Sequence, residues 1–235
     1  MSLADLLYPP LCLLCSARLP SSDQLLCSAC ALGMRRSTPP VCLRCGVSAP
    51  GAFDAEVVCA ACRQAPPVFA EARAPWQYTG TVPAAIHQFK YRRRWRLGRW
   101  LAETMTDTAK AAWPRTAMDA IVPVPRHWLK VKLRGCHPAG ELASRVAQAL
   151  GLPCHPRALR QAHWTRTQTR LEGAARHRNV RRAFTASARL VRNRRLLLVD
   201  DVLTSGATAN ACARTLKEAG AAEVFVLTAA RTPRP

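Results

Sequence analysis

The chain has 235 residues, of which 35 are Lys or Arg and 14 are Asp or Glu, so its formal net charge is +21. This length suits one ordinary domain plus a small one. The charge favours polyanionic partners such as nucleic acid, phosphate-rich ligands or an anionic membrane. No stretch approaches the roughly 20 apolar residues of a membrane span, and the N-terminus lacks the basic start and cleavage site of a signal peptide. We therefore expect a cytoplasmic protein whose cysteines are metal ligands rather than disulfides.

The first 66 residues carry four Cys-x-x-Cys pairs. Each pair places two thiolates on one side of a tight turn, and two pairs complete a tetrahedral zinc site. The candidate ligands are Cys12, Cys15, Cys27, Cys30, Cys42, Cys45, Cys59 and Cys62. We predict a double zinc-ribbon domain over residues 1–66 with two structural ions. Three pairings of the knuckles are open, with sequential pairing as the default, and repetition disfavours the alternative of a redox or catalytic dithiol.

Pro66-Pro67 marks a linker, so the second domain is expected over residues 67–235. Residues 76–80 are typical of a strand and a turn. Residues 82–91 predict a helix with Ile86 and Phe89 facing inward. The pattern after the linker is thus that of an ordinary folded domain rather than a further zinc module.

A basic segment follows that helix. Six basic residues and no acid lie between Lys90 and Arg99, with Trp95 and Trp100 interleaved. Basic and aromatic side chains together can bind single-stranded nucleic acid by charge and base stacking. The alternative is a solvated basic face with buried tryptophans. The next helix is expected over residues 99–113.

Residues 119–125 predict a second buried strand, which ends in prolines. A basic loop follows, with Arg126, Lys130, Lys132 and Arg134. Pro138 then opens a helix that has apolar residues on one face and Gly151 at its end. We expect Arg126 and Arg134, together with Lys90, to neutralise a pyrophosphate or another anion.

The remaining segments complete an alternation of strands and helices. Residues 165–184 predict a polar loop and a basic helix, with Gln168, Arg176 and Asn179 as groups that could face a site. Residues 223–230 predict a closing strand. The alternation indicates an α/β fold with an open, mainly parallel sheet. Its ligand should lie outside the carboxyl ends of the strands.

The most informative stretch joins a strand at 195–199 to a helix that ends near Gly220. Two carboxylates and a small-residue loop lie between them: Asp200, Asp201, Thr204, Ser205, Gly206, Ala207 and Thr208. Amides at a helix start attract phosphate, glycine permits close approach, and hydroxyls donate hydrogen bonds. The carboxylates suit the two hydroxyls of a ribose. Two alternatives fit less well. An ordinary capped turn would not require the two carboxylates, and a Walker loop would contain Gly-Lys-Ser/Thr, which does not occur here.

This segment is similar to the phosphoribosyl pyrophosphate (PRPP) motif of type I phosphoribosyltransferases, and the whole chain resembles the ComF family of competence-associated proteins. The resemblance rests on the Cys-x-x-Cys pairs, Tyr78-x-Gly80, Phe89-Lys90-Tyr91, Val122-Pro123-Val124-Pro125, Arg134-Gly135, Gln168, Arg176 with Asn179-Val180, and residues 199–208. The chain departs from the family at Cys136-His137-Pro138, where an aromatic residue followed by Asn-Gln is usual.

The resemblance implies a phosphoribosyltransferase-like domain that binds PRPP, with Mg²⁺ held by the ligand's own oxygens, and a part in handling single-stranded DNA during natural transformation. It also suggests a DNA-translocating, helicase-like partner. The first alternative is an active phosphoribosyltransferase with a nitrogenous acceptor, for which no catalytic residue stands out. The second is a purely structural zinc adaptor, which would leave residues 200–208 without a role.

Overall fold

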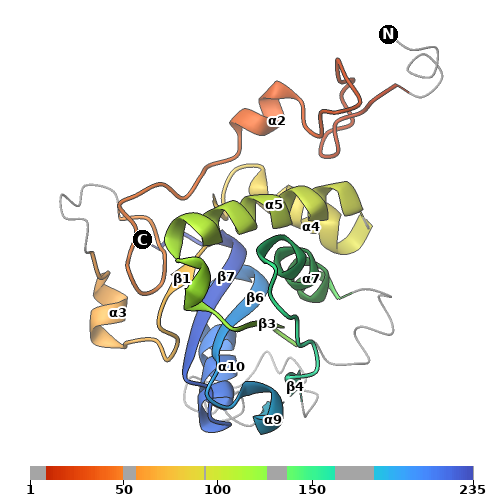
Figure 1. Ribbon diagram of the computed structural model, residues 1–235. Coiled ribbons are helices and arrows are strands. Elements are labelled where there is room, and N and C mark those ends of the chain that lie inside the picture. The colour runs from red at the N-terminus through yellow and green to blue at the C-terminus, as the bar shows by residue number, and fades with distance from the viewer. Residues whose placement is uncertain (1–8, 50–56, 93, 126–136, 162–182, 235) are drawn as a thin grey trace, which may run out of the picture.

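A computed structural model provides the structure, and it describes residues 9–49, 57–92, 94–125, 137–161 and 183–234. Its centre is a parallel sheet in the order β1–β7–β6–β3, with β2 also paired to β7 (Figure 1). These strands are β1 (Ala72–Arg73), β2 (Trp76–Gln77), β3 (Ala120–Pro123), β6 (Arg195–Leu203) and β7 (Glu223–Arg231). A separate antiparallel pair is formed by β4 (Leu159–Gln161) and β5 (Phe184–Ala186). The predicted α/β fold with a mainly parallel sheet is confirmed.

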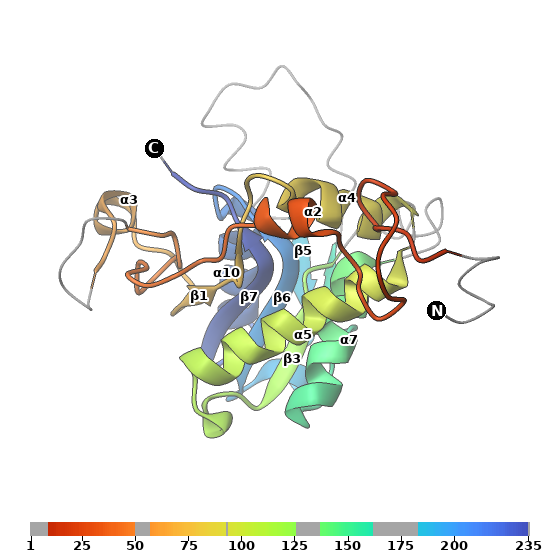
Figure 2. The same ribbon diagram turned by 90° about the horizontal axis from the view of Figure 1, so that it is seen from above.

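Helices cover both faces of the sheet. One face carries α4 (Val82–Arg92), α5 (Trp95–Ala112) and α7 (Pro138–Leu150), with α5 and α7 side by side (Figure 1, Figure 2). The other face carries α9 (Ala188–Val191) and α10 (Ala207–Glu218). A short 3₁₀ turn, η1 (Arg115–Ala117), joins α5 to β3. No helix in the described ranges has the length and apolar character that crossing a membrane requires.

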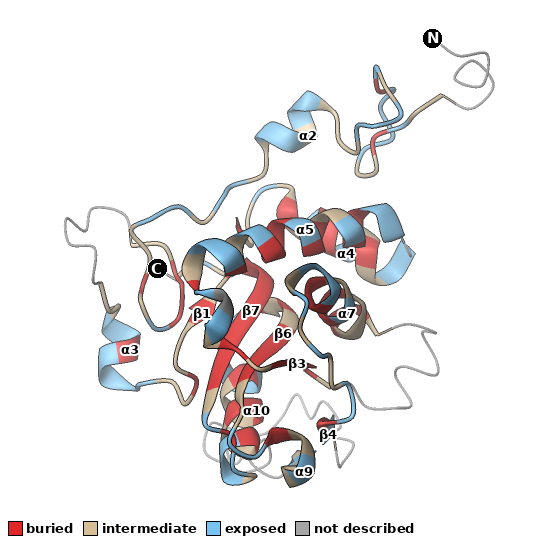
Figure 3. Ribbon diagram, viewed as in Figure 1, coloured by how far each residue is buried: buried red, intermediate tan, exposed pale blue. Residues whose placement is uncertain are grey.

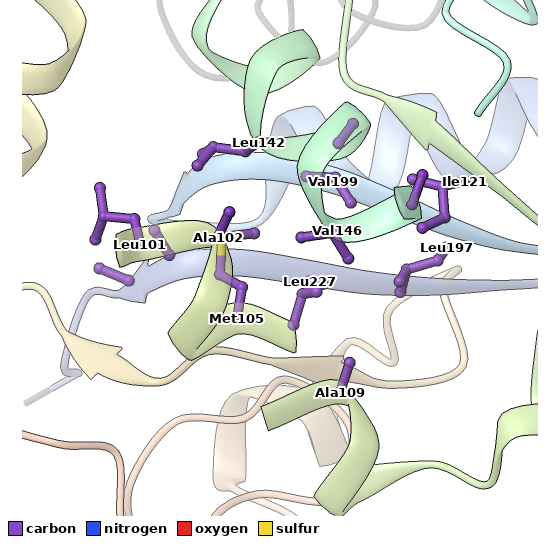
Figure 4. Packing of buried hydrophobic residues seen from close by; sticks show 14 of the residues in the cluster. Leu101, Ala102, Met105, Ala109, Ile121, Leu142, Val146, Leu197, Val199 and Leu227 are labelled. Atoms are coloured by element: carbon purple, nitrogen blue, oxygen red, sulfur yellow. The ribbon is translucent and has the colours of Figure 1, made fainter. Parts of the chain in front are cut away.

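The core follows from the alternation of side chains along β6. Leu197 and Val199 belong to the cluster beneath α5 and α7, where Leu101, Met105, Leu142 and Val146 meet them (Figure 4). Leu196 and Leu198 belong to the cluster beneath α10. Because neighbouring residues of a strand point to opposite faces, an unbroken apolar run gives a strand that is buried on both sides. Figure 3 shows β6 and its neighbour β7 as largely buried strands at the centre of the molecule.

Several element bounds differ from the sequence-based expectation. The strand predicted over 195–199 continues to Leu203, because its pairing with β7 continues as far as the Leu203–Arg231 pair. Asp200 and Asp201 therefore lie within the strand rather than after it. The helix expected from residue 99 begins at Trp95, and the closing strand reaches Arg231. The helix at 138–150 ends at Gly151 as predicted, and Gly151 has a left-handed conformation. The loop and helix predicted over 165–184 lie outside the described residues, apart from the last two positions.

The described residues of the zinc-ribbon segment, 9–49 and 57–66, have little secondary structure of their own. The helices among them are α2 (Ser28–Leu32) and α3 (Ala60–Gln64), each of five residues. The second half of the segment contacts the strands β1 and β2 at the edge of the sheet, whereas its first half contacts the turn before α4. Gly80, with a φ of +58°, would place a Cβ 2.0 Å from the carbonyl oxygen of Gly33, and Thr81 Oγ1 donates a hydrogen bond to the carbonyl of Cys30 at 2.7 Å. These contacts join the first zinc module to the start of α4.

Candidate functional site

The eight N-terminal cysteines form two clusters of four, and the knuckles pair in sequence. Cys12, Cys15, Cys27 and Cys30 form one cluster, and Cys42, Cys45, Cys59 and Cys62 form the other, with all four sulfur atoms of each within 4.8 Å of one another. The sulfur atoms of Cys15 and Cys27 are 3.6 Å apart and those of Cys45 and Cys59 are 3.7 Å apart. Tetrahedral Zn–S bonds of about 2.3 Å place sulfurs about 3.8 Å apart. Both clusters therefore fit a structural zinc ion with four thiolates.

Backbone amides support the thiolates of the second cluster. Cys42 Sγ accepts hydrogen bonds from the amides of Cys45 at 3.5 Å and Cys59 at 3.3 Å. Burial acts to raise the pKa of the Cys42 thiol, but these amides lower it to about 7. Since the thiolate is the form that binds metal, such outer contacts favour ligation.

The second cluster is held against the edge of the sheet. Gly46, with a φ of +65°, would place a Cβ 2.4 Å from the carbonyl oxygen of Ala72 in β1. The amide of Ala72 donates to the carbonyl of Arg44 at 2.7 Å, and Arg73 Nη1 donates to that of Leu43 at 2.9 Å. Only a glycine allows the knuckle to approach the strand this closely.

The carboxyl end of β6 carries two aspartates with different surroundings. Asp201 is 6% exposed, and its Oδ1 lies 2.7 Å from Lys90 Nζ at the end of α4. Asp200 accepts a hydrogen bond from the amide of Asp201 at 2.8 Å. Burial, with the Asp200 carboxylate as a second cause, raises the pKa of Cys212 on α10. The two carboxylates thus lie toward opposite faces of the sheet, Asp201 toward α4 and Asp200 toward α10.

The loop after β6 leads into the N-terminus of α10. Gly206 has a φ of +85°, and a Cβ placed there would meet no described residue within 4 Å beyond its own chain neighbours and helix. The first hydrogen bond of the helix runs from the amide of Asn210 to the carbonyl of Gly206, so the amides of residues 207–209 precede the helical ladder. Thr204, Ser205 and Thr208 are exposed. The loop presents backbone donors and hydroxyls at the positive end of a helix, which is an arrangement that attracts an anion.

Not every predicted site residue can be placed. Lys90 forms an ion pair with Asp201, which lies in β6 three residues before the loop at 204–208. Arg126 and Arg134 lie outside the described residues, although β3, which precedes them, runs parallel to β6 with Pro123 opposite Val199. His137, at the start of α7, is within 3.0 Å of the carbonyl of Val124 through Nε2. The described residues on the two sides of 126–136 therefore lie close together, next to β6 at Val199.

Sequence reasoning missed two arginines in the C-terminal segment. Arg231 is 2% exposed at the end of β7, and its Nε donates to the carbonyl of Cys45 at 3.0 Å. Its Nη1 donates to the carbonyls of Leu203 at 2.8 Å and of Thr204. Arg234 lies between Cys59 Sγ at 3.8 Å and the carbonyl of Ser205 at 3.4 Å. The sequence held one signal for Arg231, because a basic residue ends an apolar strand there. A charge buried at such a place requires a partner.

Two family models match separate parts of the chain. A double zinc ribbon domain matches residues 3–64, and a phosphoribosyl transferase domain matches residues 131–234. DNA utilization protein YhgH of Salmonella typhimurium is 32% identical over 97% of this chain and 99% of its own length. The same protein of Escherichia coli (strain K12) is 30% identical over the same shares.

More distant matches include one further full-length relative and a solved structure that aligns with part of the chain. Competence protein F of Haemophilus influenzae is 27% identical over 94% of this chain and 96% of its own length. A solved structure of the allosteric regulatory enzyme of purine biosynthesis is 24% identical, with a TM-score of 0.40, over 56% of this chain and 25% of that one. From its domain content and its full-length relatives, the chain is a member of the ComF family, with a double zinc ribbon preceding a phosphoribosyltransferase domain.

Proposed function

We propose that this protein binds PRPP at the tip of β6 and the start of α10, and that it binds single-stranded DNA during DNA uptake. The observation that carries the ligand is that Asp200 and Asp201, the latter paired with Lys90, lie in β6 just before the anion-attracting loop at residues 204–208. The amides and hydroxyls of the loop take the 5-phosphate. The carboxylates take the ribose hydroxyls, with Asp201 oriented by its ion pair.

The other end of PRPP requires positive charge. Lys90, Arg126 and Arg134 are the proposed partners of the pyrophosphate, since a departing or bound anion is stabilised by fixed cations. Mg²⁺ enters with the ligand and is held by its oxygens, with few protein contacts. Lys90 is suited both to orient Asp201 and to stabilise the pyrophosphate, because its Nζ already lies beside the carboxylate that would hold the sugar.

Calorimetric titration of PRPP with Mg²⁺ tests the ligand. Wild type is expected to bind in the micromolar range, at roughly −8 kcal/mol. The Asp200→Ala/Asp201→Ala variant is expected to lose most of this affinity, because the ribose hydroxyls lose their acceptors. Asp107→Ala/Glu218→Ala, which removes two exposed acids elsewhere, is the control of equal charge and should bind as wild type does. The absence of binding by wild type at millimolar PRPP would refute the assignment.

The DNA part of the proposal rests on charge and on the relatives, which are named for DNA utilization and competence. Arg92, Arg94, Arg96 and Arg99 are exposed around the corner between α4 and α5, with Trp95 43% exposed beside them. An exposed tryptophan among arginines can stack on a base while the charges contact phosphates. Because Lys90 lies two residues before Arg92 on α4, DNA held at this corner would lie next to the PRPP site.

A gel-shift series at increasing salt tests the DNA surface. Arg92→Gln/Arg94→Gln is expected to weaken binding of a single-stranded oligonucleotide and to lower the salt slope by roughly two, about one for each phosphate contact. Arg157→Gln/Arg160→Gln, which removes two exposed charges near β4, should change neither quantity as much. Equal losses in the two variants would mean that net charge alone, rather than this corner, governs binding.

Catalysis of phosphoribosyl transfer is a second candidate, favoured by the match of residues 131–234 to a phosphoribosyl transferase domain. Release of pyrophosphate from PRPP in the presence of a purine, a pyrimidine, ammonia or nucleic acid as acceptor would establish it.

We place the protein in the cytoplasm, where reduced cysteines persist as zinc ligands. A DNA-translocating helicase-like protein is the proposed partner there.

A further inference from the structure

Arg231 lies between the second zinc cluster and the phosphate loop. Its guanidinium reaches the backbone of Cys45, a cluster ligand, through Nε and the backbone of Leu203 and Thr204 through Nη1. The side chain is buried, and its Nη2 makes no hydrogen bond with the described residues. One rigid, planar group therefore holds two parts of the chain that are 158 residues apart, from Cys45 to Leu203.

The charge of Arg231 needs a counter-charge. No carboxylate in the described ranges forms an ion pair with it. A buried, uncompensated cation is costly by several kcal/mol. The ionised thiolates of the neighbouring cluster are the available anions, because four thiolates around one Zn²⁺ carry a net charge of about −2. Arg234, 3.8 Å from Cys59 Sγ, adds a second cation to the same cluster.

We infer that Arg231 is the buried counter-ion of the zinc–thiolate cluster of Cys42, Cys45, Cys59 and Cys62, and that it makes the position of the phosphate loop depend on this zinc site. Arg234 acts in parallel, since its other nitrogen donates to the carbonyl of Ser205 in the loop. The first cluster makes no such contact in the described residues and instead joins the start of α4 through Thr81. The two zinc sites thus have different roles. The inferred link to ligand binding rests on the function proposed above.

Zinc release to a chromogenic chelator tests the counter-ion role in the zinc-loaded protein. Arg231→Gln removes the charge and is expected to release one of the two ions about tenfold faster, as loss of an outer contact does, and the other at the wild-type rate. Arg231→Lys keeps the charge but loses the planar fork, and should retain zinc more nearly as wild type does. Release of both ions at wild-type rates from Arg231→Gln would overturn the assignment.

Hydrogen exchange of the peptide containing residues 203–210 tests the link to the loop without any ligand. Cys59→Ser and Cys27→Ser remove equivalent, half-buried ligands from the second and first clusters. Only Cys59→Ser is expected to speed exchange of the loop, by about tenfold. Equal exchange of the loop in the two variants would refute the link.

Calorimetry with PRPP completes the test. Arg231→Gln is expected to weaken PRPP binding about tenfold, which is within the usual range of coupling between sites, although the variant retains both aspartates and Lys90. Unchanged affinity would contradict the inferred coupling. Failure of wild type to bind PRPP would instead refute the proposed function, whereas the zinc-release and exchange results would still decide the role of Arg231.

Discussion

Removal of zinc is expected to unfold the segment before residue 65 while β3, β6 and β7 remain folded. The buried hydrophobic residues of the second module, within the part of the chain that the structure describes, are Val47 and three of its ligands, Cys42, Cys45 and Cys62. In the first module, α2 has no buried residue. Segments with so little apolar burial obtain their folding free energy from the metal, on the order of 10 kcal/mol per site. The sheet differs because apolar clusters cover both of its faces.

Hydrogen exchange with and without a strong chelator measures this effect, with metal content determined in parallel. Protection should disappear for amides such as that of Gly46, which donates to the carbonyl of Cys42, and should persist along β6. Restoring zinc should restore the protection, which separates metal loss from irreversible damage. Retained protection around Gly46 in fully metal-free protein would show that burial against β1, rather than zinc, folds the module.

The parts of this structure that could be predicted from sequence depend on local signals. The Cys-x-x-Cys pairs predicted the two metal-binding clusters, because a single turn fixes the spacing of the two ligands within each pair. The apolar run at 195–199 gave the central strand, and Pro138 with Gly151 gave both ends of α7. Each of these signals lies within about a dozen residues, so no knowledge of the tertiary fold was needed.

The rest depends on contacts between distant parts of the chain. The extension of β6 through its aspartates was missed because two carboxylates resemble a strand end, whereas pairing with β7 maintains the strand to Leu203. Lys90 was predicted as an anion ligand from its basic neighbours, but its contact with Asp201 spans 111 positions. The contact from Arg231 to Cys45 spans 186. Sequence patterns give no register between segments so far apart.

The ion pair of Lys90 with Asp201 gives the second large expected effect. The side chains are 17% and 8% exposed, so neither charge is well solvated. Replacing Lys90 by methionine keeps most of the side-chain volume and removes the cation from a buried carboxylate. Breaking a buried pair in this way costs about 3 kcal/mol. The Lys90→Met variant is therefore expected to unfold at lower denaturant concentration, with the same dependence on denaturant as wild type.

A double-mutant cycle separates the pair from its surroundings. Lys90→Met/Asp201→Asn removes both charges and should recover part of the stability lost in Lys90→Met, since no charge of the pair is then left buried. Lys110→Met, at an exposed position on α5, is the matched control and should change stability by less than about 0.5 kcal/mol. Additive losses in the double variant would show that the two charges do not stabilise one another. PRPP binding should fall in both Lys90 variants, because both lack the cation that the pyrophosphate requires and the double variant also lacks a carboxylate for the ribose.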